Sequence, residues 1–159
     1  MFYSFASISR KGDQVIPIPP LNYPKSSHTL KHLKKNTPTI MIVDDNDDFR
    51  GLVKVMLINA PYLLIECASG SEAYSKVIEN KPDLILMDIY MPDMDGYETT
   101  KKVRFIYQDI PIIFLSASKD KESVDKAMSA GGNEYLHKSF NRKDLSNLLK
   151  KYLMIFSYP

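Results

Sequence analysis

The stretch that decides the fold is Asp83-Leu-Ile-Leu-Met-Asp88, an apolar run that ends in a carboxylate and leads into Met91-Pro-Asp-Met-Asp-Gly96. A short apolar run closed by turn-forming residues is typical of a strand buried on both faces, as in a parallel sheet. An uncompensated carboxylate at the end of a buried strand is costly. Asp88 is therefore expected to have a chemical role.

Three further runs also end in a polar or charged side chain: Ile40-Met-Ile-Val-Asp44-Asp45, Ile112-Ile-Phe-Leu-Ser116 and Glu134-Tyr-Leu-His-Lys138. With one more apolar run they predict five strands, at about 39–44, 62–67, 84–88, 111–116 and 134–137. Apolar residues at helical spacing follow each strand. They predict helices from about 47, over 71–80, 94–107 and 120–130, and from about 141.

This alternation of strands and helices indicates the fold class. Short connections between alternating elements imply an α/β fold, a parallel sheet covered by helices on both faces. Five β–α units favour the smaller doubly wound, flavodoxin-like arrangement, a three-layer sandwich with strand order 2-1-3-4-5. The first and third strands are neighbours in that order, so Asp44, Asp45 and Asp88 are expected to meet at the carboxyl edge of the sheet. Ser116 and Lys138 would line the same edge.

The N-terminal segment differs in composition from the rest. The first 38 residues contain five of the ten prolines, six basic residues and one acidic residue, whereas the remainder carries fifteen basic and eighteen acidic residues. Pro-rich sequence favours extended polyproline II over a packed element, here with a short helical turn near Leu30–Lys35. We expect a flexible basic arm or linker at 1–37, one domain at 38–155 and a short tail at 156–159.

Two features bear on the compartment. Cys67 is the one cysteine, so an intrachain disulfide is excluded, and its place in a strand-like run predicts a small buried hydrophobe. No apolar run reaches the roughly 18 residues of a membrane span, and the N-terminus lacks the basic and apolar regions of a signal peptide. The expected location is cytoplasmic.

The polar residues at the sheet edge have the chemistry of metal-assisted phosphoryl transfer. Clustered carboxylates repel one another, and Mg²⁺ suits them because it prefers carboxylate oxygens and keeps waters that a phosphoryl donor can displace. No His or Cys ligand set of the kind that zinc prefers is present. Asp88 can act as a nucleophile that forms an aspartyl phosphate. The Lys138 ammonium and the Ser116 hydroxyl would stabilise charge on the transferred group.

Four motifs carry a family resemblance: Ile42-Val-Asp-Asp-Asn46, Leu86-Met-Asp-Ile-Tyr-Met-Pro-Asp-Met-Asp-Gly96, Pro111-Ile-Ile-Phe-Leu-Ser-Ala117 and Tyr135-Leu-His-Lys-Ser-Phe140. Together they resemble the receiver domain of two-component response regulators, of the single-domain, chemotaxis-regulator-like kind. The resemblance covers about residues 38–153. A lone Asp-Asp or Met-Asp-Gly would be weak evidence, but the combination is highly specific.

The resemblance implies a role for each matching residue. Asp88 would take a phosphoryl group from a histidine kinase or a histidine phosphotransfer protein, and Lys138 would pair with Asp88 and then with the phosphoryl oxygens. Ser116 would be the switch hydroxyl that moves onto the phosphoryl group, and Tyr135 the aromatic residue that turns inward afterwards. The implied Mg²⁺ ligands are Asp88, Asp45, Asp44 through a water, and the backbone carbonyl of Tyr90.

One position departs from the family pattern. The family usually has proline after the lysine, with a cis peptide bond between them, but this chain has Ser139. A cis bond before a non-proline residue costs about 2.5–4 kcal/mol. We therefore predict a trans Lys138–Ser139 bond, which puts the placement of Lys138 in doubt.

The resemblance also implies a signalling protein and not an enzyme, since it would catalyse only its own phosphorylation and dephosphorylation. Few residues follow the last helix, so we expect no attached DNA-binding domain and output through protein contacts. A downstream target is expected at the face formed by the helix at 120–130, the strand at 134–137 and the last helix. That face carries Lys119, Lys121, Lys126, Arg142 and Lys143. A phosphorylation-linked dimer is a further option.

Other interpretations stay open from the sequence. Hydrolases of the haloacid dehalogenase kind also form an aspartyl phosphate, but they have a second Asp two residues after the nucleophile, where this chain has Tyr90. A phosphorylation-independent interaction module and a receiver segment of a hybrid histidine kinase are further alternatives. Taken singly, Asp44 and Asp45 suit helix capping, Ser116 a turn, Lys138 a solvated surface position and Tyr135 plain strand packing.

Overall fold

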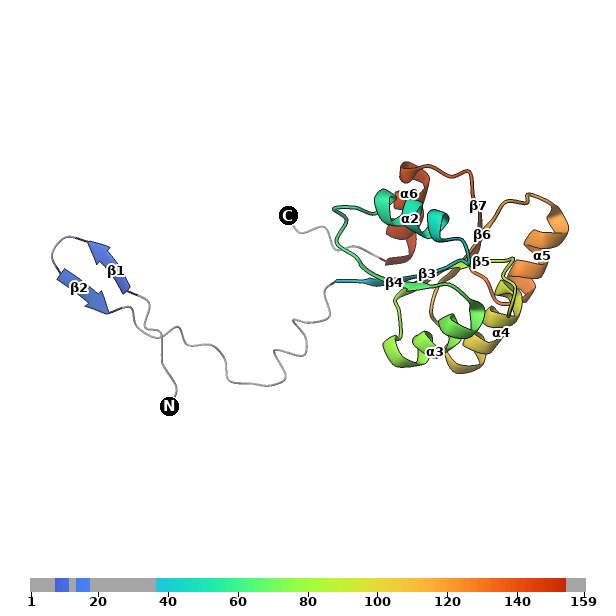
Figure 1. The fold of residues 1–159 in the computed structure, drawn as a ribbon, viewed down its shortest axis with the longest axis horizontal. Coiled ribbons are helices and arrows are strands. Elements are labelled where there is room, and N and C mark those ends of the chain that lie inside the picture. Colours follow the sequence, from blue (N-terminus) through green and yellow to red (C-terminus); the bar gives the residue numbers. More distant parts are fainter. Residues whose placement is uncertain (1–7, 12–13, 18–36, 154–159) are drawn as a thin grey trace. The chain divides into compact units, whose positions relative to one another are not determined.

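A computed structural model describes residues 8–11, 14–17 and 37–153. The chain divides into two compact units, at 1–35 and 36–159, and each is described by itself. Figure 1 shows both units, coloured along the sequence.

The first unit contains an antiparallel pair of strands. β1 (Ile8–Lys11) pairs with β2 (Gln14–Pro17), with Ile8 opposite Pro17 and Lys11 opposite Gln14. The sequence analysis did not predict these two strands, and the flexible arm or linker at 1–37 stays a prediction. Two residues of turn-forming type, Gly and Asp, separate the strands in the sequence, and the second strand contains the β-branched pair Val-Ile. The predicted helical turn at Leu30–Lys35 lies outside the described residues, as does the predicted tail.

The second unit is built from five parallel strands, each followed by a helix. Its strands are β3 (Thr39–Val43), β4 (Leu63–Cys67), β5 (Leu84–Asp88), β6 (Ile112–Ser116) and β7 (Glu134–His137). Its helices are α2 (Asp47–Met56), α3 (Gly70–Asn80), α4 (Gly96–Ile106), α5 (Lys121–Ser129) and α6 (Arg142–Leu153). The sheet order is β4-β3-β5-β6-β7, which confirms the predicted order 2-1-3-4-5.

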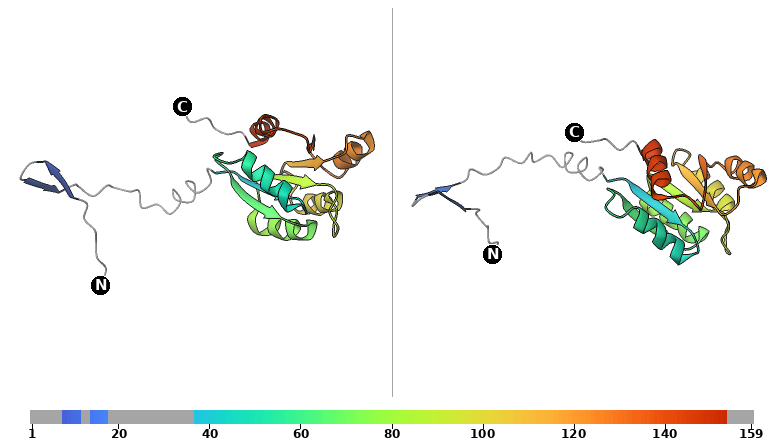
Figure 2. Two further views of the ribbon diagram at one scale, coloured as in Figure 1. Left: turned by 45° about the horizontal axis from the view of Figure 1, so that its top comes forward. Right: turned by 90° about the horizontal axis from the view of Figure 1, so that it is seen from above.

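The helices cover the sheet in two layers (Figures 1 and 2). Side chains of α2 and α6, such as Val53 and Leu145, share one core cluster with Ile40, Ile42 and other residues on that face of the sheet. Side chains of α3, α4 and α5 share the second cluster with the opposite face. The predicted three-layer sandwich is therefore confirmed, with an apolar core on each side of the sheet.

Burial along the strands explains the sequence pattern. β5 and β6 are buried at every position, as their continuous apolar runs predict, and β3 is buried at all but its first residue. The edge strands carry the charges: Glu66 in β4 pairs with Lys54 at 2.8 Å, and Glu134 in β7 pairs with Lys151 at 2.7 Å. Cys67 is buried as predicted, and burial raises the pKa of its thiol to about 12.

The helix ends follow from capping residues. At the start of each of the five helices from α2 to α6, a side chain accepts a hydrogen bond from the backbone N–H three residues later; the accepting residues are Asn46, Ser69, Asp95, Asp120 and Asn141. The predicted cap at Ser69 is confirmed. The predicted stop of α5 at two glycines is also seen, because Gly131 has a φ of 104°, which favours glycine. Within 37–153, no helix combines the length and apolar composition that crossing a membrane requires.

Candidate functional site

Three carboxylates meet at the carboxyl edge of the sheet. Asp44 and Asp45 directly follow β3, Asp88 ends β5, and these two strands are neighbours. One oxygen atom from each residue lies within 4.8 Å of the others. Asp44 and Asp88 are buried, whereas Asp45 is exposed. The topology therefore brings the three predicted ligands together, with one of them open to solvent.

Lys138 reaches this cluster from the end of β7. Its Nζ atom lies 2.7 Å from Asp44 Oδ2 and 2.9 Å from Asp88 Oδ1. The same atom lies 4.5 Å from the ring centroid of Phe49, whose ring packs edge-on against Phe140. Two carboxylates and one aromatic face thus fix the ammonium in place. Lys138 is not the solvated surface lysine of the alternative interpretation.

The Lys138–Ser139 bond is trans as predicted, since the described residues contain no cis peptide bond. The backbone N–H of Lys138 donates to Ser116 O at 2.7 Å, which extends the pairing of β6 and β7 by one residue. The trans bond does not displace Lys138 from the cluster, because its ammonium contacts both buried aspartates.

The capping alternative for the paired aspartates is excluded by α2 itself. Asn46, not Asp44 or Asp45, accepts the hydrogen bond from Phe49 N that caps this helix. Asp44 Oδ1 accepts from Asn46 N at 3.0 Å. Asp44 Oδ2 is buried and accepts no hydrogen bond of good geometry in the described part of the chain, although the Lys138 ammonium is within ion-pair distance. This oxygen and its two carboxylate neighbours suit a hard divalent cation such as Mg²⁺.

The electrostatics of the cluster leave one negative charge in excess on its two buried carboxylates. Burial and the nearby charge of Asp44 raise the pKa of Asp88, and the hydrogen bond from Lys138 offsets this only in part. Burial lowers the pKa of Lys138, but its ion pairs with both aspartates outweigh burial, so that the pKa is raised. The ammonium therefore stays charged at neutral pH, while ionisation of Asp88 is disfavoured relative to a solvated aspartate.

Asp88→Asn is expected to raise stability at pH 7 in magnesium-free buffer, because the folded state no longer holds an ionised carboxylate that it disfavours. A carboxyl whose pKa is raised by folding destabilises the protein above that pKa, and acidification through it relieves the cost. The advantage of the variant should shrink as the pH falls from 7 to 4. Urea unfolding of both proteins at the two pH values measures this. An equal difference at both pH values would contradict it.

Ser116 and Tyr135 both contact Ser118, in the loop after β6. Ser116 is buried, and its Oγ atom accepts from Ser118 N at 3.1 Å. The Tyr135 hydroxyl donates to Ser118 O at 2.9 Å, while its ring packs against the core cluster. Ser116 thus makes the turn contact of its alternative interpretation, and Tyr135 both packs on the sheet and reaches the loop. Their switch roles stay predictions.

Tyr90 lies two residues beyond Asp88, with a side chain that is 63% exposed. The metal role implied for its backbone carbonyl stays a prediction. Its neighbours in the same loop are more informative, and sequence reasoning assigned them no role.

Asp93 ties this loop to the start of α3. Its carboxylate oxygens accept from Gly70 N at 3.3 Å and Ser71 N at 3.1 Å, and hydrogen bonds from backbone N–H groups hold its pKa well below the usual range. A helix N-terminus is a favourable place for an anion. The sequence marks Asp93 only as a turn residue, so its partner depended on the fold.

Gly96 allows the chain to pass tightly over Asp88. A Cβ atom at this position would lie 2.0 Å from Asp88 O, and Gly96 N donates to Ile89 O at 2.9 Å. The backbone of Asp88 is therefore held by the start of α4. A glycine that closes a turn just after a strand ending in a carboxylate is the signal that could have indicated this contact.

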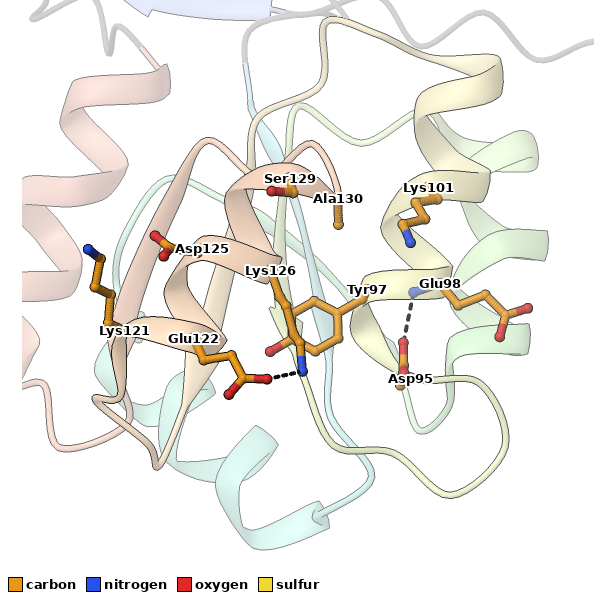
Figure 3. A pocket seen from close by; sticks show the side chains of 10 residues that line it. All are labelled: Asp95, Tyr97, Glu98, Lys101, Lys121, Glu122, Asp125, Lys126, Ser129 and Ala130. Atoms are coloured by element: carbon orange, nitrogen blue, oxygen red, sulfur yellow. Dashed lines mark hydrogen bonds and ion pairs between the residues drawn. The ribbon is translucent and has the colours of Figure 1, made fainter.

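A cleft lies elsewhere, between α4 and α5 (Figure 3). It has a volume of about 1040 Å³ and is lined by Asp95, Tyr97, Glu98, Lys101, Lys121, Glu122, Asp125, Lys126, Ser129 and Ala130. Its charged residues include both signs, and Glu122 and Lys126 form an ion pair at 2.7 Å. None of its lining residues belongs to the carboxylate cluster. The cleft is therefore separate from the carboxylate cluster.

Comparisons with known proteins agree with this geometry. A family model described as the response regulator receiver domain matches residues 40–150. The phosphate regulon transcriptional regulatory protein PhoB of Pseudomonas aeruginosa is 32% identical over 117 residues, which are 72% of this chain and 51% of that protein. The response regulator protein VraR of Staphylococcus aureus is 34% identical over 117 residues, 72% of this chain and 56% of that protein. The chain thus spans about half the length of these curated relatives.

Solved structures agree as well. The chemotaxis protein CheY4 of Vibrio cholerae is 30% identical with a TM-score of 0.70, and the match covers 73% of this chain and 98% of CheY4. The receiver domain of the sensor histidine kinase PA1611 of Pseudomonas aeruginosa, with a magnesium ion coordinated in its active site cleft, is 30% identical with a TM-score of 0.69. That match covers 74% of this chain and 98% of the PA1611 domain.

Proposed function

Because the chain belongs to the response regulator receiver domain family, we propose that Asp88 accepts a phosphoryl group from a histidine kinase or a histidine phosphotransfer protein in a two-component phosphorelay. One observation carries the proposal: a single ammonium, that of Lys138, bridges two buried carboxylates, Asp44 and Asp88, at the carboxyl edge of the sheet. Burying two carboxylates and an ammonium costs free energy, and proteins retain such buried charges where the chemistry requires them.

Asp44, Asp45 and Asp88 would hold a magnesium ion, with Asp44 acting through a water and the Tyr90 carbonyl as a further ligand. Their oxygens lie close enough together to share one cation, and the PA1611 receiver domain, which is similar, coordinates magnesium in its cleft. Bound Mg²⁺ would neutralise the charge of the carboxylates and of the incoming phosphoryl oxygens.

The chain's own residues would do the rest of the transfer. A carboxylate oxygen of Asp88 attacks the phosphorus atom, and the bond from phosphorus to the donor's histidine nitrogen breaks, leaving a neutral histidine after protonation. Lys138 then moves its charge interaction from Asp88 to the new phosphoryl oxygens, and the Ser116 hydroxyl donates to them. In this role the protein is a phosphoacceptor that catalyses only its own phosphorylation and dephosphorylation.

The switch would begin with Ser116. A hydroxyl that turns toward the phosphoryl group gives up the hydrogen bond from Ser118 N, and Tyr135 is bonded to the carbonyl of the same residue. Phosphorylation would in this way bias two arrangements of the loop after β6.

A target protein would bind the face formed by α5, β7 and α6. Some basic side chains of this face are already bonded within the domain, which leaves fewer of them to contact the target. Arg142 donates to Val55 O at 2.6 Å, and Lys126 pairs with Glu122, so both are occupied within the domain. The exposed ammonium groups of Lys119, Lys121 and Lys143 make no ion pair among the described residues. An acidic partner would meet these lysines, and a phosphorylation-linked dimer would be formed through the same face.

A receiver segment of a hybrid histidine kinase is the second candidate. The similarity to the receiver domain of the sensor histidine kinase PA1611 favours it. In that case the donor histidine would belong to the same signalling protein, and the chemistry at Asp88 would be unchanged.

The test is incorporation of phosphate from acetyl phosphate, followed by intact mass. The protein is expected to gain one phosphoryl group with Mg²⁺ and none with EDTA. Asp88→Asn should gain none, whereas Asp109→Asn, which changes an exposed aspartate before β6 at the opposite edge of the sheet, should behave as the parent. No incorporation by the parent protein would overturn the proposal and favour the phosphorylation-independent interaction module. Undiminished incorporation in Asp88→Asn would place the acceptor elsewhere.

A further inference from the structure

His137 and Ser139, the residues before and after Lys138, are joined by hydrogen bonds. His137 ends β7, and its Nδ1 atom lies 2.6 Å from Ser139 Oγ and 3.2 Å from Ser139 N. On the other side of the ring, His137 Nε2 lies 2.9 Å from Ala117 O. One imidazole therefore joins the residue after Lys138 to the residue after Ser116.

The partners decide the role of each ring nitrogen. A backbone N–H can only donate, so Nδ1 accepts from Ser139 N and from the Ser139 hydroxyl. A carbonyl can only accept, so the proton is on Nε2, which donates to Ala117 O. A neutral imidazole in this tautomer satisfies all three contacts at once.

A turn at the end of β7 explains how these contacts bear on Lys138. His137 and Ser139 contact each other within this turn, while the ammonium of Lys138, which lies between them in the sequence, contacts Asp44 and Asp88. Phe140 N donates to His137 O at 3.1 Å, which closes the turn beyond the lysine. The contacts of His137 with Ser139 and Phe140 thus restrain the backbone that carries the Lys138 side chain.

We propose that His137 and Ser139 form a clamp that positions the Lys138 ammonium for phosphoryl transfer and couples its loop to the loop that follows Ser116. They are positioning residues and do not touch the reacting atoms. Serine allows the backbone after Lys138 more conformational freedom than proline would, and the hydrogen bonds of the clamp would restrict that freedom and so keep the ammonium in position. The inference rests on the proposed function of Asp88, since it assigns residues that serve the same reaction.

The first experiment measures the rate of phosphate incorporation from acetyl phosphate with saturating Mg²⁺. Ser139→Ala, which removes the hydroxyl, and His137→Phe, which keeps a ring but removes all its hydrogen bonds, are expected to slow incorporation about tenfold. Ser139→Thr keeps the hydroxyl and should restore the parent rate. Ser75→Ala removes an exposed hydroxyl that is bonded within α3 to Ser71 O, and it should change nothing. Parent-like rates in both clamp variants would overturn the clamp while leaving Asp88 as the acceptor.

The second experiment does not depend on phosphorylation. If the clamp acts through Lys138, the losses in Tm from Ser139→Ala and Lys138→Met must couple, and the double variant should lose less than the two single losses together. Additive losses would show that Ser139 supports only its own turn and would overturn the clamp. A parent protein that takes up no phosphate but shows this coupling would refute the proposed function and keep the positioning of Lys138.

Discussion

Lys138→Met is expected to lower the free energy of unfolding by about 3 kcal/mol at pH 7 in magnesium-free buffer. Methionine keeps much of the side-chain volume but leaves the buried carboxylates of Asp44 and Asp88 without a counter-ion. We choose the lower end of the range for a broken buried pair because the lysine side chain is itself 22% exposed. Urea unfolding followed by circular dichroism measures the loss.

The matched control is Lys126→Met. Lys126 makes one ion pair, with Glu122 on the same helix, and both side chains are mostly exposed. Its loss should cost no more than about 0.5 kcal/mol. Adding Mg²⁺ should recover part of the stability of Lys138→Met, because a divalent cation replaces the missing charge. The double variant with Asp88→Asn should recover part of it without metal. Equal losses in the two lysine variants would show that the cluster is not held by charge.

Gly96→Ala is expected to lower the free energy of unfolding by about 3 kcal/mol and to slow phosphate incorporation by roughly tenfold or more. A methyl group at this position would lie 2.0 Å from the carbonyl oxygen of Asp88, and backbone on both sides of the contact leaves no flexible atom to yield. The acceptor residue must therefore shift. The same change at Gly51 gives the control. A methyl group there meets nothing within 4 Å, and replacing a mid-helix glycine should stabilise α2 by about 0.5–1 kcal/mol.

Both glycine variants are compared by urea unfolding and by uptake of phosphate from acetyl phosphate. A stable Gly96→Ala protein with a parent-like rate would mean that the β5–α4 turn adjusts without moving Asp88. A stable protein with a slowed rate would separate the position of the acceptor from the stability of the domain. The Gly51→Ala protein should take up phosphate at the parent rate.

The sequence predicts the strands of the parallel sheet better than the segments outside it, because the central strands are buried on both faces. β5 and β6 are covered on both faces, so nearly every residue must be apolar, and the run itself marks the strand. The hairpin at Ile8–Lys11 and Gln14–Pro17 contains no such apolar run, because two strands of four residues each are too short to show a clear pattern. Prolines nearby drew the interpretation toward an extended arm.

The site divides in the same way. Asp44, Asp88 and Lys138 follow strands, so the order of the sheet was enough to bring them together. Asp93 and His137 have partners on segments far away in the sequence or in a neighbouring loop, and their types fit bland roles in a turn or a strand. The cap of α2 was missed for a different reason. Four aspartates surround Asn46, and all five residues are good caps, so the sequence alone does not choose among them.

The shared contacts of Ser118 would make the proposed response of the loop cooperative. The N–H of this residue donates to Ser116, and its carbonyl accepts from Tyr135, so one peptide segment carries both restraints. If Ser116 turns toward a phosphoryl group as proposed, the hydrogen bond from Ser118 N to Ser116 breaks. The segment that accepts the hydrogen bond of Tyr135 then has one restraint fewer. The hydroxyl and the ring then behave as one unit with two states, and the strength of the signal is set by the fraction of molecules that have switched. A weak stimulus would move few molecules completely, and not all molecules a little.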